Sequence, residues 1–117
     1  MISKVLDVTS DFNAASSYIQ DLSGWDYAVV QVVSPSGAVS FTSTNDDGSV
    51  TGDLNPVPVQ PANFLTVFGL NLVTNTAVTS ASASALVRFN VIGRFLRLAG
   101  TSVTATKVLI SLNKVTP

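Results

Sequence analysis

Short apolar segments separated by turn residues run along the whole chain, a pattern that is typical of β-strands. The segment Trp25–Val33 is nearly continuous in apolar residues, as in a central strand that is covered on both faces. Ala38–Thr44 alternates instead, with Val39 and Phe41 on one face and hydroxyl residues on the other. The intervening Ser34–Gly37 contains Pro and Gly, which favour a turn, so we predict that the two strands pair as a hairpin.

The rest of the chain predicts more short strands. Phe64–Val73 is either one long strand or a strand pair kinked at Gly69, and Thr76–Ala85 is a loop or an edge strand. Asn55–Pro61 holds three prolines, which cannot occupy a central strand. One helical turn is predicted at Asn13–Ser17. Further strands are expected at Ile2–Val8, Tyr18–Leu22, Val50–Leu54, Leu86–Val91, Arg94–Leu98 and Val103–Asn113.

These elements predict a single domain over residues 1–117, in which residues 1–24 form an N-terminal strand and arm. The fold class is all-β: an antiparallel β-sandwich, jelly-roll-like, with about eight strands. Val and Thr are abundant and Glu is absent, which also favours strands over helices. A chain of 117 residues is long enough to bury a core without disulfides.

The composition excludes several kinds of chemistry. The chain has no His and no Cys, and all seven acidic residues are Asp. A Ser-His-Asp triad, a thiolate nucleophile and the usual zinc ligand sets are therefore impossible. Charged residues make up 11% of the chain and the net charge is −1, so no basic field attracts nucleic acid. We expect no enzyme activity, no cofactor and no bound metal.

Two less favoured hypotheses, a calcium site and a hydrolase, rest on the aspartates. Asp46, Asp47 and Asp53 offer oxygen ligands for Ca²⁺, but their spacing does not match the known calcium loop. A hairpin turn with solvated carboxylates is the expectation here. An Asp-based hydrolase would need two carboxylates about 5–10 Å apart across a cleft, which the sequence does not place.

Trp25 and Tyr27 lie two residues apart and hence on one face of the predicted strand. If that face is exposed beside a groove, the rings could stack on sugar rings, as in a carbohydrate-binding module. If both rings are buried, they serve as core packing, which is the commoner role of aromatic side chains.

A self-association surface is predicted from the middle of the chain. Phe64 and Phe68 are four residues apart and share a face if the segment is one strand, while the opposite face is apolar as well. Because so few residues are charged, a monomer would have little charged surface to keep it apart from other copies, which favours a subunit interface. Arg94 and Arg97 belong to a cluster that holds half of all cations, and we expect them to pair with Asp within the chain or across a subunit interface. Solvated strand faces are the alternative.

The order of segments over residues 25–112 resembles a β-sandwich module of structural proteins from tailed-bacteriophage virions. Three features carry the resemblance: a strand that ends in a Ser-Gly turn, a following strand that runs into an Asn-Asp-Gly turn, and small residues before a strand, a Gly corner and an aromatic-x-Arg strand. These features lie at Trp25–Val33 with Ser36-Gly37, at Ala38–Thr44 with Ser43-Thr44-Asn45-Asp46-Asp47-Gly48, and at Ser80–Ala85, Leu86–Val91, Gly93 and Arg94–Leu98. The aromatic residue that usually follows the Asp-Gly turn is absent from Ser49–Asp53.

The resemblance implies a virion structural protein, such as a capsid decoration or head–tail accessory protein. Such a protein would act as a homo-oligomer that binds neighbouring capsid or tail subunits. The alternative is a carbohydrate- or receptor-binding module of a phage fibre or baseplate. Met1–Val8 does not look like a signal peptide, and Phe64–Val73 is too short to span a bilayer. We therefore expect synthesis in the host cytoplasm, no membrane partner and a place in the virion.

Overall fold

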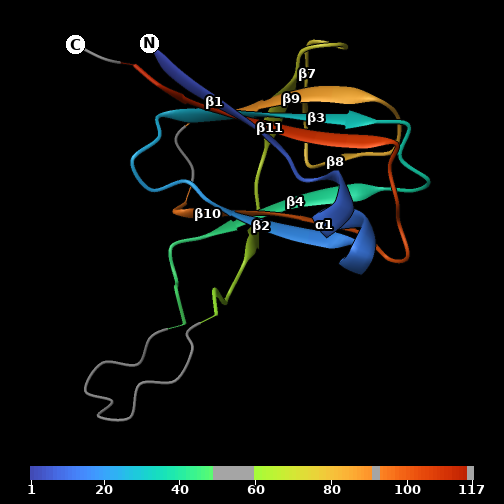
Figure 1. The fold of residues 1–117 in the computed structure, drawn as a ribbon, viewed down its shortest axis with the longest axis horizontal. Coiled ribbons are helices and arrows are strands. Elements are labelled where there is room, and N and C mark those ends of the chain that lie inside the picture. The colour runs from blue at the N-terminus through green and yellow to red at the C-terminus, as the bar shows by residue number, and fades with distance from the viewer. Residues whose placement is uncertain (49–59, 91–92, 116–117) are drawn as a thin grey trace.

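Two antiparallel β-sheets stack face to face in the computed structural model, which describes residues 1–48, 60–90 and 93–115 (Figure 1). The described residues form eleven strands and one helix. Their bounds are β1 (Ile2–Asp7), α1 (Thr9–Ala15), β2 (Ser17–Asp21), β3 (Tyr27–Val33), β4 (Val39–Thr44), β5 (Leu65–Thr66), β6 (Gly69–Asn71), β7 (Thr76–Val78), β8 (Ser80–Ala81), β9 (Ala85–Phe89), β10 (Phe95–Ala99) and β11 (Lys107–Lys114).

The strand order is that of a jelly roll with an insertion. One sheet has the order β1-β11-β3-β9-β6-β7, and the other has the order β2-β10-β4-β5, with β8 paired to β4. Eight of these strands are arranged as in a jelly roll, with β1-β11-β3-β9 in one sheet and β2-β10-β4-β5 in the other. The strands β6, β7 and β8 are additions between β5 and β9. The prediction of an all-β sandwich is confirmed. The described residues hold eleven strands rather than about eight, because Phe64–Val73 and Thr76–Ala85 together contain the four short strands β5 to β8.

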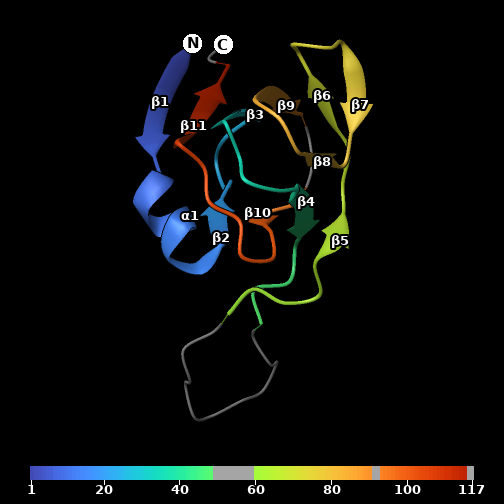
Figure 2. The same cartoon turned by 90° about the vertical axis from the view of Figure 1, so that its right-hand side faces the viewer.

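The strand β1 forms one edge of the six-stranded sheet. It pairs with β11 so that Lys4 lies opposite Leu112. Because Leu112 is buried in the core, Lys4 is on the inward side of the sheet at its open edge. At the same side of the sandwich, α1 covers the opening between the two sheets and inserts the fully buried Phe12 (Figure 2).

The core between the sheets is made by alternate residues of both layers. Val30 and Val32 face it from β3, and Leu96 and Leu98 face it from β10; all four are almost completely buried. At its centre Phe41 of β4 meets Phe89 of β9 edge to face, with ring centroids 5.1 Å apart. The alternation read from the sequence at β4 is therefore confirmed, since Val39 and Phe41 are both inaccessible to solvent.

The predicted hairpin between residues 25–33 and 38–44 is wrong. The strand β3 pairs with β11 and β9 in one sheet, whereas β4 pairs with β10 and β5 in the other. The connection between them crosses from one sheet to the other, with Ser34 at φ 48°. Because of this crossing, the apolar faces of the two strands face each other across the core from opposite sheets.

Other element boundaries also differ. The helix covers Thr9–Ala15 and not Asn13–Ser17, because the Asp7 side chain accepts the N–H of Thr9 and turns the chain earlier. The segment Phe64–Val73 is a strand pair that changes sheets, so Phe64 and Phe68 do not share a strand face. The last strand begins at Lys107, not Val103. The strand predicted at Val50–Leu54 lies outside the described residues. No helix in the described part of the chain is long and apolar enough to cross a membrane.

Candidate functional site

A pocket of about 580 Å³ opens at one end of the sandwich. It lies where β2, β4 and β9 end and where β3 and β10 begin, so five strands meet at it. Its volume falls within the range of roughly 300–1,000 Å³ that is usual for small-molecule sites. The lining consists of Leu22, Ser23, Trp25, Asp26, Tyr27, Asn45, Asn90, Gly93 and Arg94.

Two aromatic rings line this pocket, and both are half-buried. Tyr27 is the first residue of β3, and the guanidinium carbon of Arg88 lies 4.2 Å from the centre of its ring. Trp25 precedes the strand, so the prediction that the two rings share a strand face is wrong. Instead the backbone N–H of Trp25 donates to the carbonyl of Leu22, and its ring packs against the core. The rings are therefore neither fully exposed nor core residues, and both border a cavity.

Each of the polar side chains of Asn45, Asn90 and Asp26 uses one of its polar atoms in a hydrogen bond within the chain. Asn45 Oδ1 accepts the backbone N–H of Arg94 at 2.8 Å, and Asn90 Oδ1 accepts from Arg88 Nε at 2.9 Å. Among the described residues, neither Asn45 Nδ2 nor Asn90 Nδ2 has a hydrogen-bond partner. Asp26 Oδ2 accepts the N–H of Val115 at 2.6 Å. Each of these side chains is thus oriented by one hydrogen bond, while the two amide NH₂ groups and the second oxygen of Asp26 stay available to a ligand.

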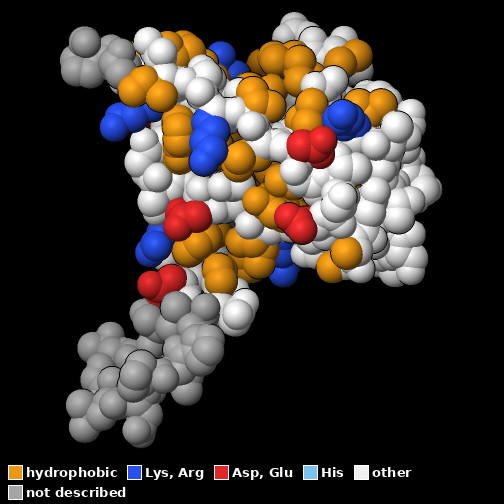
Figure 3. Space-filling view, in the orientation of Figure 1, with side chains coloured by type: hydrophobic (Ala, Val, Ile, Leu, Met, Phe, Trp, Pro, Cys, Tyr) orange, Lys and Arg blue, Asp and Glu red, His pale blue; other side chains and the backbone are white. Residues whose placement is uncertain are grey.

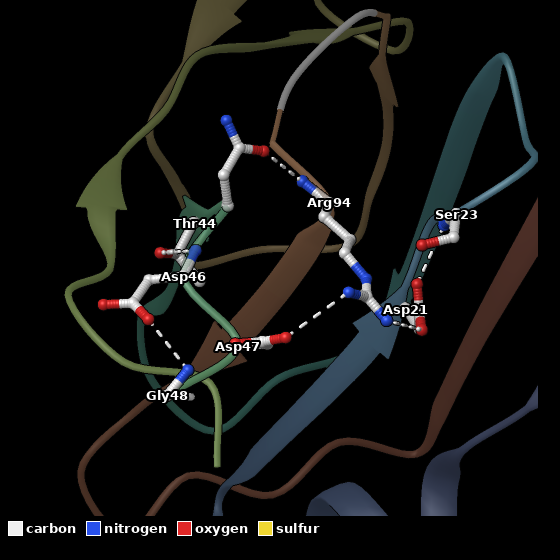
Figure 4. A network of polar contacts seen from close by, with 8 residues as sticks. Asp21, Ser23, Thr44, Asp46, Asp47, Gly48 and Arg94 are labelled. Carbon is white, nitrogen blue, oxygen red and sulfur yellow. Dashed lines mark hydrogen bonds and ion pairs between the residues drawn. The ribbon is translucent and has the colours of Figure 1, made fainter. Parts of the chain in front are cut away.

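Arg94 closes one side of the pocket by bridging two strand ends (Figure 4). Its guanidinium lies 3.5 Å from a carboxylate oxygen of Asp21, after which β2 ends, and 3.7 Å from one of Asp47, beyond β4. The same group lies 4.8 Å from the centre of the Phe95 ring. The expected pairing of Arg94 with Asp thus occurs within the chain.

Asp21 is held in its charged form by these contacts. Its carboxylate accepts the backbone N–H of Ser23, and this hydrogen bond, a second from the Ser23 side chain and the charge of Arg94 together lower its pKa below the ordinary value of 3.8. Since the carboxylate binds protons less readily in the folded chain than in the unfolded one, it stabilises the fold at pH above 3.8 and loses that effect as the pH falls through the folded pKa.

We expect Asp21→Asn to reduce stability by about 0.5 kcal/mol at pH 7, because the pair is exposed and screened by solvent. The difference from the native chain should shrink as the pH is lowered from 7 through the folded pKa, which lies below 3.8, and should be smallest at the lowest pH at which both chains still fold. Urea unfolding at both pH values measures it, and about 0.5 M NaCl should shrink the effect at pH 7. An equal difference at both pH values would show that charge is not the cause.

The turn after β4 is organised by hydrogen bonds. Asp46 accepts the N–H of Gly48 at 2.8 Å and the side-chain amide of Asn63 at 2.6 Å, and Gly48 has φ 83°. The chain contacts this turn again at Ala62, whose backbone N–H donates to the carbonyl of Asp46. Asp53 lies outside the described residues. In the described ranges, no three acidic residues cluster in a way that could hold a metal ion.

The predicted interface residues have different surroundings. Arg97 stacks on the half-buried Phe64 ring at 4.3 Å, and its Nε donates to the hydroxyl of Thr42. Phe68 is 71% exposed, between β5 and β6. Of the four, Phe64, Arg94 and Arg97 have contacts within the chain, and Phe68 is the one whose ring is mostly open to solvent. Their role between subunits stays a prediction.

The carboxylates that line the pocket can be compared with those that the Asp-based hydrolase would need. The lining contains one carboxylate, that of Asp26, whereas acid–base cleavage of a glycoside uses two. Sequence reasoning selected Trp25 and Tyr27 but missed Asn45 and Asn90. Both asparagines resemble ordinary turn residues, and only the fold brings them together. No family of known proteins, no curated protein and no solved structure matches the chain.

Proposed function

We propose that this chain is a virion structural protein that assembles with copies of itself and with neighbouring subunits through the outer face of its six-stranded sheet. The place in a virion rests on the resemblance of residues 25–112 to tailed-phage structural modules. The fold is compatible with it, since jelly rolls build capsid domains, but the same fold also builds lectins and does not decide function. The surface is the observation that supports assembly.

The outer face of the six-stranded sheet carries apolar side chains on several of its strands, with Ser111, Gln31 and Arg88 between them. Since Ala28, Val30 and Val32 point inward from β3, Val29 points outward. The registers place Val5 of β1 and Leu70 of β6 on the same side as Val29, and these two side chains are 64% and 39% exposed. Leu109 of β11 and Leu86 of β9, both half-buried, form a second row on this face.

Charge on this face is sparse, and on the side of the molecule in Figure 3 charged side chains likewise lie singly among polar and hydrophobic ones. The guanidinium of Arg88 lies over the ring of Tyr27, and its Nε–H donates to Asn90 Oδ1. At one end of the face Lys107 and Asp7 form an ion pair at 3.8 Å. Two copies that meet here would bring both Arg88 side chains into the contact, each held over its own Tyr27 ring.

The size of the face fits a weak pairwise contact that is reinforced by assembly. Six strands about 4.8 Å apart, with about five residues of 3.3 Å each, give roughly 450 Å² per copy. Two copies would bury about 900 Å², close to the lower limit of about 1,000 Å² for a specific interface. Such a contact is weak between free copies and becomes strong when many copies are held on one particle.

Sedimentation of a charged variant tests the surface. We expect the native chain to self-associate at about 0.1–1 mM, and Val29→Lys to be monomeric with an unchanged β-type circular dichroism spectrum, because a buried interfacial charge costs several kcal/mol. Ile19→Lys makes the same change on the outer face of the other sheet and should still associate. Labelling of purified phage particles by an antibody against the chain tests its place in the virion.

Phe68→Ser separates this surface from the one predicted from the sequence. If Phe68→Ser dissociates the oligomer and Val29→Lys does not, the interface is the segment between β5 and β6, and the outer sheet face is not used. A native chain that remains monomeric at about 1 mM, a concentration at which even a contact of about 4 kcal/mol is half-formed, would contradict assembly through either surface.

A further inference from the structure

We infer that the pocket at the end of the sandwich binds a neutral saccharide, an activity that goes beyond assembly and does not depend on it. The inference rests on the residues that line the pocket and on which of their atoms are free. Half-buried aromatic rings, two asparagine amides and one carboxylate line a space large enough for one or two sugar rings.

The aromatic part of the site suits the apolar faces of a sugar. Trp25 packs against the core. The Tyr27 ring lies on the outer face of the sheet, where Arg88 covers it and where its hydroxyl lies 3.5 Å from Met1 Sδ. A ring that is already held in place loses little conformational freedom when a ligand stacks on it. Aromatic side chains with one polar end serve sites that are partly apolar and partly wet.

The polar part of the site suits hydroxyl groups. Asn45 and Asn90 are oriented by hydrogen bonds to their oxygens, so each presents an NH₂ group whose direction is fixed. Asp26 uses one carboxylate oxygen for Val115 and has the other available as an acceptor. A sugar hydroxyl both donates and accepts, so adjacent hydroxyls match an amide donor beside a carboxylate acceptor.

The charges of the pocket favour a neutral ligand over an acidic one. Asp26 and Arg94 are the charged residues of the lining, and their formal charges cancel. Arg94 is also already placed between the carboxylates of Asp21 and Asp47, which reduces its attraction for a further anion. A carboxylated sugar would therefore meet the negative charge of Asp26 without an unpaired cation to offset it.

The single tryptophan of the chain makes the site directly observable. Because Trp25 is the only one, its fluorescence and its indole N–H resonance report on this pocket alone. The probes are four neutral disaccharides (lactose, maltose, cellobiose and N,N′-diacetylchitobiose) and the acidic 3′-sialyllactose. We expect at least one neutral disaccharide to give a saturable change of both signals, and 3′-sialyllactose to bind at least tenfold more weakly.

Two conservative variants connect the signal to the proposed contacts. Asn45→Asp and Asn90→Asp each keep the acceptor oxygen that the fold uses and remove the NH₂ group, so each should weaken binding about tenfold with the circular dichroism spectrum unchanged. Asn75→Asp, in the exposed β6–β7 hairpin, adds the same charge outside the pocket and should bind as the native chain does.

Three results would overturn the inference. The first is no saturable change at Trp25 with any neutral disaccharide up to about 50 mM, beyond which binding is too weak to be specific. The second is a response that Asn45→Asp and Asn90→Asp leave unchanged. The third is binding of 3′-sialyllactose as tight as that of the neutral sugars. None of these outcomes affects sedimentation, so failure of the saccharide site is distinguishable from failure of assembly through the sheet face.

Discussion

Replacing Phe89 by Ala is expected to lower the free energy of unfolding by about 3–5 kcal/mol. The ring is completely buried at the centre of the sandwich, and its edge-to-face contact with Phe41 adds to the apolar area that it removes from water. Urea unfolding should show a lower midpoint with an unchanged slope, because the same surface is exposed on unfolding. Phe68→Ala removes an equal ring that is 71% exposed and should cost less than about 0.5 kcal/mol.

A double-mutant cycle isolates the ring contact itself. Phe41→Ala alone should cost about as much as Phe89→Ala, and the two together should cost less than the sum by about 0.5–1.5 kcal/mol. If the double variant does not fold, Phe41→Leu and Phe89→Leu provide the same cycle at lower cost. Strict additivity would show that the two rings do not interact across the sheets.

Gly69→Ala is expected to destabilise the chain by about 1–3 kcal/mol, although Gly→Ala in open space is commonly stabilising. A Cβ atom at Gly69 would lie 2.4 Å from a methyl carbon of Val87 and 2.7 Å from the Phe89 ring. The φ of Gly69 is not positive, so the cost comes from overlap with the core and not from backbone strain. Thermal and urea unfolding of the variant measure it.

A second substitution should relieve the overlap. Val87→Ala removes the methyl carbon that the new Cβ would strike, so Gly69→Ala combined with Val87→Ala should be more stable than the sum of the two separate losses predicts. The gain should be about 1 kcal/mol, since the added methyl fills part of the space that Val87 leaves. Purely additive losses would contradict close packing of β6 on β9.

The sequence indicates strand content well because alternation is a local property. Val39 and Phe41 alternate with hydroxyl residues, and their burial follows from that pattern alone. Pairing is different, because the partners of β3 are β11 and β9, which lie more than fifty residues further along the chain. Consecutive strands pair more often than not, so a short connection with Pro and Gly favours the wrong hairpin.

The pocket could be predicted only in part, because it too is formed by residues that lie far apart in the sequence. Trp25 and Tyr27 are conspicuous in any sequence, because aromatic residues two apart suggest a shared surface. Asn45 and Asn90 follow different strands and carry ordinary turn chemistry. Only the jelly-roll order brings the ends of β4 and β9 to the same end of the sandwich as the start of β3.

The edges of the two sheets determine how copies can add to one another. The edge strands β5 and β7 are two and three residues long, which is too short to template a further strand. The longer edge β1 carries Lys4 on its inward side, where a strand from another molecule would have to bury the ammonium group. Edge-to-edge growth is therefore disfavoured at these three edges, and the fourth edge is β2. In the proposed face-to-face contact, two copies would instead form a closed, two-fold symmetric pair, which stops growing once both faces are covered.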